Sequence, residues 1–313
     1  MSRQHNRWLV NVPVATLWTN PESPRDIDRP SITNPVDLPA WLEKLNYQKR
    51  LDLCDQNLVQ SQLLYGEEVL VLEERQDWLH VIVPSQPSKK DPRGYPGWIP
   101  ACQAVPRPDT KEVIGRATVS GKRASLYDEK REFLFSLSYL TVLPLLAVTD
   151  SDVKVRLPDG TAGYLARSGV EVDYQGDTVV KGSGTDIIKT GEAFLGLEYL
   201  WGGMSSYGYD CSGFSYNMHK ANGYQIPRDA SDQAALAGEE IAMDKLLPGD
   251  LLFFAYEEGK GSLHHVGIYY GDGKMIHSPT TGKSVEITTL AGTVYEKELC
   301  GARRYWQQTE VTQ

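Results

Sequence analysis

The stretch Lys181-Gly182-Ser183-Gly184 separates two parts of the chain that differ in sequence pattern. Before it, short β-branched and aromatic runs broken by Pro, Gly and Asp predict strands. After it, apolar residues at helical spacing come first and strand-like runs follow, as in α+β domains. The length of 313 residues leaves room for two or three domains. The sequence therefore predicts an all-β part followed by an α+β part.

The all-β part contains two sets of predicted strands with one rhythm. Each has a strand, a long connecting segment (the excursion), a hairpin, and Gly followed by an aromatic residue before the last strand (GYPGWIP and DGTAGYLA). Residues 38–64, in the first excursion, have helical spacing and predict a helical insertion. We interpret the sets as two small barrels over 1–108 and 109–182, followed by a third domain over 183–313. Both barrels resemble bacterial SH3 domains.

The α+β part is predicted to contain helices over 185–197, 211–222 and 229–237. Glycines after the last two ranges are typical helix ends. The runs LLFFAY and HHVGIYYGDGKMIHSP then predict strands, and the second run predicts a hairpin around residues 271–273.

Charge and composition exclude several classes of function. Residues 1–182 contain 22 basic and 24 acidic residues, whereas residues 183–313 contain 10 and 17. Such an acidic C-terminal part repels polyanions, which argues against nucleic acid and favours a small cationic or zwitterionic substrate. The four cysteines lack CxxC spacing, so neither a zinc site nor a disulfide framework is expected. The sequence has no apolar run of membrane-spanning length and no signal-peptide pattern, and we expect a cytoplasmic protein without a membrane partner.

Cys211 follows the Gly- and Ser-rich segment YLWGGMSSYGYD and precedes a predicted helix. The free N–H groups and positive dipole end of a helix N-terminus favour a thiolate. They also supply donors for an oxyanion that forms beside the sulfur. The alternative is a buried, inert cysteine, which is the commoner role of a cytosolic cysteine.

Three of the six histidines lie on the two arms of the predicted hairpin. A three-residue loop pairs Gly267 with His277 and places His265 beside His277 on one face, with His264 on the other. A two-residue loop would put His265 and His277 on opposite faces. The first geometry gives a base oriented by a second polar ring, as in a catalytic triad. Two structural strand histidines are the alternative.

The motifs DCSGF, PGDLLFF and HVGIYYGDGKMIHS resemble those of the NlpC/P60 cysteine peptidases, over roughly residues 183–306. Members of this family have a papain-like α+β fold and cleave bacterial cell-wall peptides. The resemblance implies that Cys211 is the nucleophile, His265 the base, and His277 the residue that orients His265. It also matches Tyr199 to a family tyrosine whose hydroxyl lies near the oxyanion.

With its two SH3-like barrels, the whole chain resembles the γ-D-glutamyl-L-diamino-acid endopeptidases that trim murein tripeptides and tetrapeptides. The resemblance implies a first barrel that restricts the site to peptides with a free N-terminal L-Ala, in cell-wall peptide recycling. Tyr95 or Trp98 of that barrel is the candidate aromatic lid. We expect a monomer that uses no cofactor.

Several polar residues near Cys211 are candidates for binding substrate. Asp210 can accept a substrate α-ammonium and also cap the helix that follows it. Ser212 and Ser231 supply hydroxyls, and Arg228 is expected at the surface or in a local ion pair.

Two other functions remain open at this point. One is a secreted hydrolase of intact peptidoglycan, and the other is a non-catalytic wall-binding protein whose barrels carry the function. The complete set of one cysteine and two histidines favours an enzyme.

Overall fold

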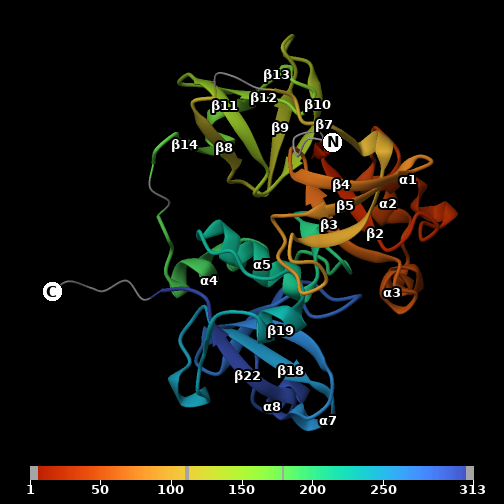
Figure 1. Cartoon of the computed structure of the whole chain (residues 1–313). Helices are drawn as coiled ribbons and strands as arrows, with labels where there is room; N and C mark the ends of the chain where they lie inside the picture. Colours follow the sequence, from red (N-terminus) through yellow and green to blue (C-terminus); the bar gives the residue numbers. More distant parts are fainter. Residues whose placement is uncertain (1–5, 110–112, 178–179, 308–313) are drawn as a thin grey trace. The chain divides into compact units, whose positions relative to one another are not determined.

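The computed structural model describes residues 6–109, 113–177 and 180–307 (Figure 1). They group into two compact units. One unit contains both β-rich regions together with Ser205–Tyr207. The other contains the segment Gln86–Pro92 and the rest of the C-terminal region.

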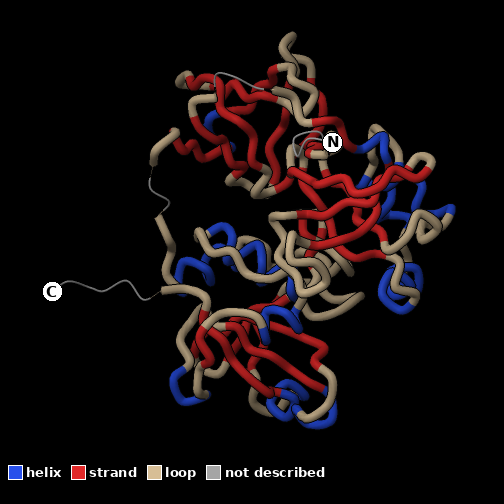
Figure 2. The backbone as a smooth tube through the Cα atoms, viewed as in Figure 1, coloured by secondary structure: helices blue, strands red, loops and turns tan. Residues whose placement is uncertain are grey.

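The β-rich unit is built from short strands, and the three α-helices described in it all lie between β2 and β3 of the first region (Figure 2). The elements of the first region are β1 (Arg7–Val10), β2 (Val14–Trp18), α1 (Arg29–Ile32), α2 (Leu38–Lys44), α3 (Tyr47–Asp55), β3 (Val59–Leu64), β4 (Glu68–Arg75), β5 (Trp78–Val83), β6 (Tyr95–Pro100) and β7 (Ala104–Pro106). Those of the second are β8 (Gly115–Val119), β9 (Arg123–Tyr127), β10 (Phe133–Ser138), β11 (Val142–Val148), β12 (Asp152–Arg156), β13 (Ala162–Ala166) and β14 (Val170–Tyr174).

The two regions have the same topology. The first sheet has the order β3-β2-β6-β5-β4-β1-β7, and the second has the order β10-β9-β13-β12-β11-β8-β14. Each strand of the second sheet therefore has a counterpart seven numbers lower in the first. Each sheet encloses an apolar core of its own. This confirms the prediction of two SH3-like barrels of one type.

The Gly–aromatic motif has the same role in both barrels. A Cβ on Gly97 of β6 would lie 2.5 Å from Leu17 Cγ, and one on Gly163 of β13 would lie 2.9 Å from Leu157 Cδ2. Real side chains do not approach so closely, so only glycine lets these strands pack against the barrel interior.

The predicted helical insertion over 38–64 is right for its first part and wrong for its last. Helix α3 ends before Asn57, whose φ of 51° is left-handed. The chain then enters β3, which pairs with β2 from Val59 to Leu64. Strand pairing at this position outweighs the helical spacing of the apolar residues.

The C-terminal unit is α+β, as predicted. Its elements are α4 (Gly184–Glu192), β15 (Met204–Ser205), β16 (Gly208–Tyr209), α5 (Cys211–Ala221), α6 (Ala230–Ala235), β17 (Glu239–Glu240), β18 (Leu251–Ala255), α7 (Tyr256–Gly259), β19 (Leu263–Gly271), β20 (Lys274–His277), β21 (Glu286–Thr289), α8 (Val294–Glu298) and β22 (Leu299–Arg304). The sheet has the order β17-β22-β18-β19-β20-β21, and α5 packs against β19 and α4. This packing brings the start of α5 to the histidine-bearing hairpin.

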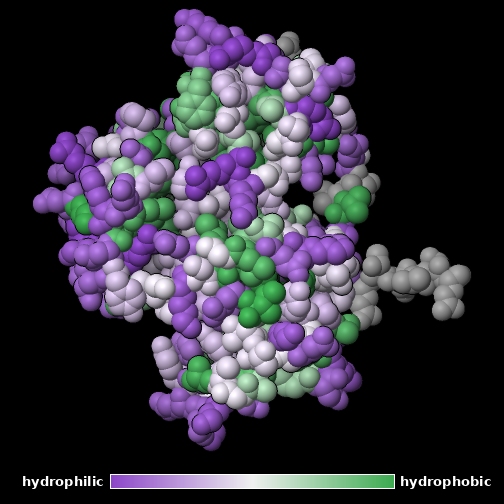
Figure 3. Space-filling view, turned by 180° about the vertical axis from the view of Figure 1, so that it is seen from behind, coloured by the Kyte–Doolittle hydropathy of each residue, from purple (hydrophilic) through white to green (hydrophobic). Residues whose placement is uncertain are grey.

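The surface is mostly polar. On the face shown in Figure 3, hydrophobic side chains form small groups separated by hydrophilic ones. None of the helices within the described ranges combines the length and apolar character that a membrane-spanning helix requires.

Candidate active site

Cys211 is the first residue of α5, as predicted. Asp210 is the N-cap, and its Oδ1 accepts a hydrogen bond of 2.6 Å from the backbone N–H of Gly213. A Cβ on Gly213 would lie 2.2 Å from the carbonyl oxygen of Gly203, so this position has no room for a side chain. The Asp-Cys-Ser-Gly sequence thus combines a helix cap with a close backbone approach, which holds the cysteine at the helix N-terminus.

The hairpin that carries the histidines has a two-residue turn and not the three-residue loop that we expected. Gly271 pairs with Lys274, which leaves Asp272 and Gly273 as the turn. Both turn residues have positive φ, as the commonest two-residue hairpin turns require. An irregularity in the ladder between Tyr269 and Gly271 takes up one extra residue. The bulge restores the register that a three-residue loop would have given.

The restored register brings the two histidines together on one face. His265 Nε2 lies 2.7 Å from His277 Nδ1, and both rings are buried. Gly267, two residues after His265 on β19, lies opposite His277, where a Cβ would approach His277 Cβ to 3.3 Å. The predicted side-by-side arrangement of His265 and His277 is confirmed.

His264 is the extra residue at an irregularity in the pairing of β19 with β18, so the expected placement of His264 and His265 on opposite faces is wrong. Its ring stacks on Tyr256 at 4.1 Å between centroids, and its Nε2 lies 3.0 Å from Glu298 Oε2. The ring centroid of His264 also lies 6.4 Å from that of His265, so His264 is a neighbour of the histidine pair.

The proton equilibria at the site favour neutral groups. Burial, together with the charge of Asp210, raises the pKa of Cys211 to about 12, although backbone N–H groups of Val266 and Ser212 partly oppose this. Burial, together with the charge of His277, lowers the pKa of His265. Desolvation therefore opposes the thiolate that the helix N-terminus favours, and formation of the thiolate stays a prediction. The sulfur can instead lose its proton by passing it to a neighbouring imidazole.

A buried ion pair supports the start of α5. Arg228 Nη2 lies 2.7 Å from Asp210 Oδ2, and Nη1 donates to Ser212 Oγ at 2.9 Å. Ser212 Oγ in turn donates to Asp210 Oδ1 at 3.2 Å. Arg228 is 1% exposed, so the expected surface position is wrong and the expected local ion pair is confirmed. The sequence could not reveal this burial, because Arg228 lies 18 residues beyond its partner.

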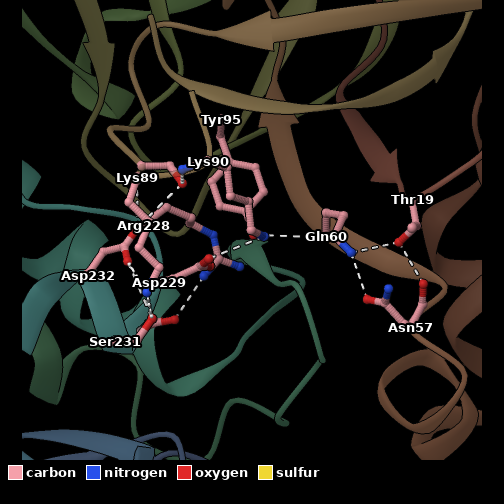
Figure 4. Close-up of polar contacts among 12 residues, drawn as sticks. Thr19, Asn57, Gln60, Lys89, Lys90, Tyr95, Arg228, Asp229, Ser231 and Asp232 are labelled. Carbon is pink, nitrogen blue, oxygen red and sulfur yellow. Dashed lines mark hydrogen bonds and ion pairs between the residues drawn. The ribbon is translucent and has the colours of Figure 1, made fainter. Parts of the chain in front are cut away.

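Ser231 lies at the start of α6, beside a segment that comes from the loop between β5 and β6 (Figure 4). Lys89 Nζ of that loop donates to Ser231 Oγ at 3.3 Å and lies 3.1 Å from Asp232 Oδ1. The buried Asp232 also accepts the backbone N–H of Lys89 at 2.9 Å. These contacts hold the loop on the C-terminal unit. A role of Ser231 in substrate binding stays a prediction.

Tyr95 and Trp98 belong to β6 of the first barrel. The Tyr95 hydroxyl donates to Gln60 Oε1 at 3.4 Å, and Gln60 Nε2 donates to Thr19 Oγ1 at 2.6 Å (Figure 4). The ring of Trp98 stacks on His80 at 4.8 Å. Contact of Tyr95 with substrate stays a prediction.

Tyr199 and Tyr295 are the two tyrosines of interest in the C-terminal unit. Tyr199 forms a parallel bridge with Tyr209 just before α5, and its place near an oxyanion stays a prediction. Tyr295 of α8, which the sequence analysis missed, has its ring 5.5 Å from that of His265 and 5.2 Å from that of His277. No motif or spacing marks Tyr295, because α8 packs beside the histidines only in the folded sheet.

Two family models match parts of the chain. Residues 196–304 match the NlpC/P60 family, and residues 119–172 match the YKFC SH3b2 domain. The first match includes Cys211 and both histidines of the pair, and the second lies in the second barrel.

Similar proteins span almost the whole chain. The gamma-D-glutamyl-L-lysine dipeptidyl-peptidase of Bacillus subtilis is 51% identical over 297 residues, which cover 94% of this chain and 97% of the relative. A protein with the same name from Bacillus cereus is 40% identical over 310 residues, covering 97% and 92%. The crystal structure of an NlpC/P60 family protein from Bacillus cereus has a TM-score of 0.91 at 40% identity, covering 96% of this chain and 100% of that one. The chain therefore belongs to the NlpC/P60 family.

Proposed function

We propose that this protein is a cysteine peptidase that hydrolyses the bond between γ-D-glutamate and a diamino acid in murein peptides, releasing L-Ala-D-Glu. The observation that carries the proposal is the hydrogen bond between His265 and His277 on β19 and β20, against which α5 places Cys211. The name and the 51% identity of the Bacillus subtilis relative support the choice of bond.

The proposed reaction begins with a proton transfer. His265 takes the proton of Cys211 Sγ, and the sulfur attacks the γ-carbonyl carbon of D-glutamate. Backbone N–H groups at the start of α5, with Tyr199, stabilise the oxyanion. His265 then gives its proton to the leaving amine, and water hydrolyses the thioester. His277 keeps the His265 ring in the orientation that both transfers need.

Asp210 should contribute less to binding the substrate α-ammonium than the sequence suggested. Its charge is already shared with Arg228, so a substrate that lacks an ammonium group leaves no unpaired carboxylate. N-acetylation of the L-Ala then costs one charge-assisted hydrogen bond. We expect a fall of about 10- to 100-fold in kcat/KM.

Hydrolysis of defined peptides tests the proposal. The protein is incubated with L-Ala-γ-D-Glu-L-Lys, L-Ala-γ-D-Glu-meso-diaminopimelate, their N-acetylated forms and intact peptidoglycan, and products are identified by mass spectrometry. Cys211→Ala is the inactive control, and Cys300→Ala, at an exposed cysteine, is the matched active control. We expect L-Ala-D-Glu from the free peptides.

Other products would point to the alternatives. Equal rates on free peptides, N-acetylated peptides and intact peptidoglycan would indicate a general wall hydrolase. Binding to peptidoglycan with no hydrolysis of any substrate would indicate a wall-binding protein. The monomeric state and the cytoplasmic location stay predictions, which size-exclusion chromatography and cell fractionation test.

A further inference from the structure

The hydrogen bonds of the histidine pair continue onto β21. His277 Nε2 lies 3.0 Å from Thr288 Oγ1, and Thr288 Oγ1 donates to Glu286 Oε1 at 3.3 Å. Both residues lie on the strand next to His277, where Glu286 is its direct cross-strand partner. None of the motifs in the sequence includes them. A continuous series of polar contacts therefore runs from His265 to a carboxylate.

The direction of each hydrogen bond follows from the chemistry of the base. Because His265 Nε2 faces His277, Nδ1 of His265 is the nitrogen left to accept the thiol proton. A neutral imidazole with a free Nδ1 carries its proton on Nε2, so His265 donates to His277 Nδ1. The proton of His277 must then be on Nε2, which donates to Thr288 Oγ1.

The opposite direction would inactivate the base. If the Thr288 hydroxyl donated to His277 Nε2, His277 would carry its proton on Nδ1 and donate to His265 Nε2. His265 would then be protonated on Nδ1 and unable to accept the thiol proton. Glu286 excludes this arrangement, because a carboxylate is an acceptor and takes the proton of the Thr288 hydroxyl.

We propose that Thr288 and Glu286 are positioning residues that fix the tautomer of His277 and, through it, of His265. The inference rests on the proposed function of His265 as the base. Glu286 also lies 3.8 Å from His277 Nε2, where its charge stabilises the imidazolium that forms during proton transfer. Neither residue touches the reacting atoms.

Polar and titratable groups of three neighbouring elements contact His277. His265 faces it from β19, Thr288 and Glu286 from β21, and Tyr295 from α8. Burial lowers the pKa of His277, and the positive charge of Lys283, which lies 3.9 Å from Glu286, lowers it further. Burial raises the pKa of Tyr295 to about 12, so Tyr295 stays neutral during a pH profile between 5 and 9.

Strand alternation supplies a matched control. Thr289 follows Thr288 on β21 but is exposed on the other face. We therefore compare Thr288→Val, which keeps the shape and removes the hydroxyl, with Thr288→Ser, which restores the hydroxyl, and with Thr289→Val. Glu286→Gln, at a half-exposed side chain, is a fourth variant that does not depend on how the core tolerates Thr288→Val.

Two measurements are made on the full chain. The first is the tautomer of His277 from long-range ¹H–¹⁵N NMR spectra of protein labelled at histidine, and the second is the pH profile of kcat and KM on the free tripeptides. We expect the Nε2–H tautomer in the wild type, in Thr288→Ser and in Thr289→Val. Thr288→Val should show mixed tautomers and a kcat about 10- to 100-fold lower at nearly unchanged KM, as for loss of an outer-shell partner. Glu286→Gln should show a smaller loss in the same direction.

Two results would overturn the inference. One is an Nδ1–H tautomer of His277 in the wild type. The other is full kcat together with an unchanged tautomer in both Thr288→Val and Glu286→Gln. A wild type that hydrolyses no peptide would refute the proposed function instead, while the NMR spectra would still decide the direction of the hydrogen bonds.

Discussion

The nucleophile Cys211 and the base His265 are held in place by interactions of different kinds. Cys211 begins a helix whose cap, Asp210, is neutralised by the buried Arg228. His265 is held by a neutral ring, that of His277, on a hairpin. Removing either charge disrupts a buried ion pair, whereas a series of hydrogen bonds between rings and hydroxyls is disrupted when its direction is lost. Substitutions in the ion pair should lower the stability of the protein. Substitutions along the hydrogen bonds of His265 and His277 should lower activity while the protein stays folded.

The largest expected effect is the loss of activity when the base is removed. His265→Ala should reduce hydrolysis of the tripeptide by about 10²- to 10⁴-fold, because the thiol loses its base and the leaving amine its acid. His264→Ala is the matched control, since His264 Nε2 pairs with Glu298, whereas His265 Nε2 pairs with His277. Both variants should unfold at nearly the temperature of the wild type. Equal losses of activity at the two positions would mean that the base is assigned wrongly.

The next largest expected effect is the loss of stability when the ion pair beside Cys211 is broken. Arg228→Met should lower the free energy of unfolding by about 3–5 kcal/mol, because it leaves the buried charge of Asp210 without its ion-pair partner. Adding Asp210→Asn should recover part of this loss. Arg75→Met breaks an ion pair with Glu22 in which both side chains are more than half exposed, and it should change stability by about 0.5 kcal/mol or less. Urea denaturation measures the free energy of unfolding of all three variants. Similar losses in Arg228→Met and Arg75→Met would contradict the claim that the buried ion pair stabilises the start of α5.

Acid should destabilise the protein through buried neutral histidines. Burial lowers the pKa of His219 to about 4, and its Nε2 has no hydrogen-bond partner among the described residues. Because this folded pKa lies below the unfolded value of about 6.5, the stabilisation is complete above that pH and is lost as the pH falls toward 4. His219 alone should remove about 2 kcal/mol by pH 5.

His219→Gln should flatten this dependence on pH. The free energy of unfolding is measured at pH 7, 6 and 5 for the wild type and the variant, and the decrease on acidification should be smaller in the variant. Identical slopes would show that His219 does not contribute, and would leave His277, whose pKa burial lowers to about 3, as the source.

Local sequence rules explain a large part of the site. The Asp-Cys-Ser-Gly sequence carries its own helix cap, so the place of Cys211 at the start of α5 could be predicted from neighbouring residues. Strand alternation likewise predicted that only one of His264 and His265 pairs with His277. Both features depend on interactions within a few residues along the chain.

Features that depend on distant partners could not be predicted in this way. The bulge near Tyr270 is set by how the hairpin pairs, and the correct register followed although the loop length was wrong. The burial of Arg228 and the contact of Thr288 with His277 arise only when separate elements pack. Strand β3 was mistaken for helix for the same reason, because its pairing with β2 is not visible in the spacing of its apolar residues.

The central claim is that Cys211 loses its proton to His265, because burial opposes a lone thiolate. The most direct test is the rate at which iodoacetamide alkylates Cys211 at pH 7 in the wild type and in His265→Ala, followed by peptide mass spectrometry with the exposed Cys102 and Cys300 as internal references. We predict that Cys211 reacts faster than both references in the wild type and more slowly than both in His265→Ala, where burial opposes ionisation of the thiol and no base accepts its proton. Equal alkylation rates of Cys211 in the two proteins would contradict the account.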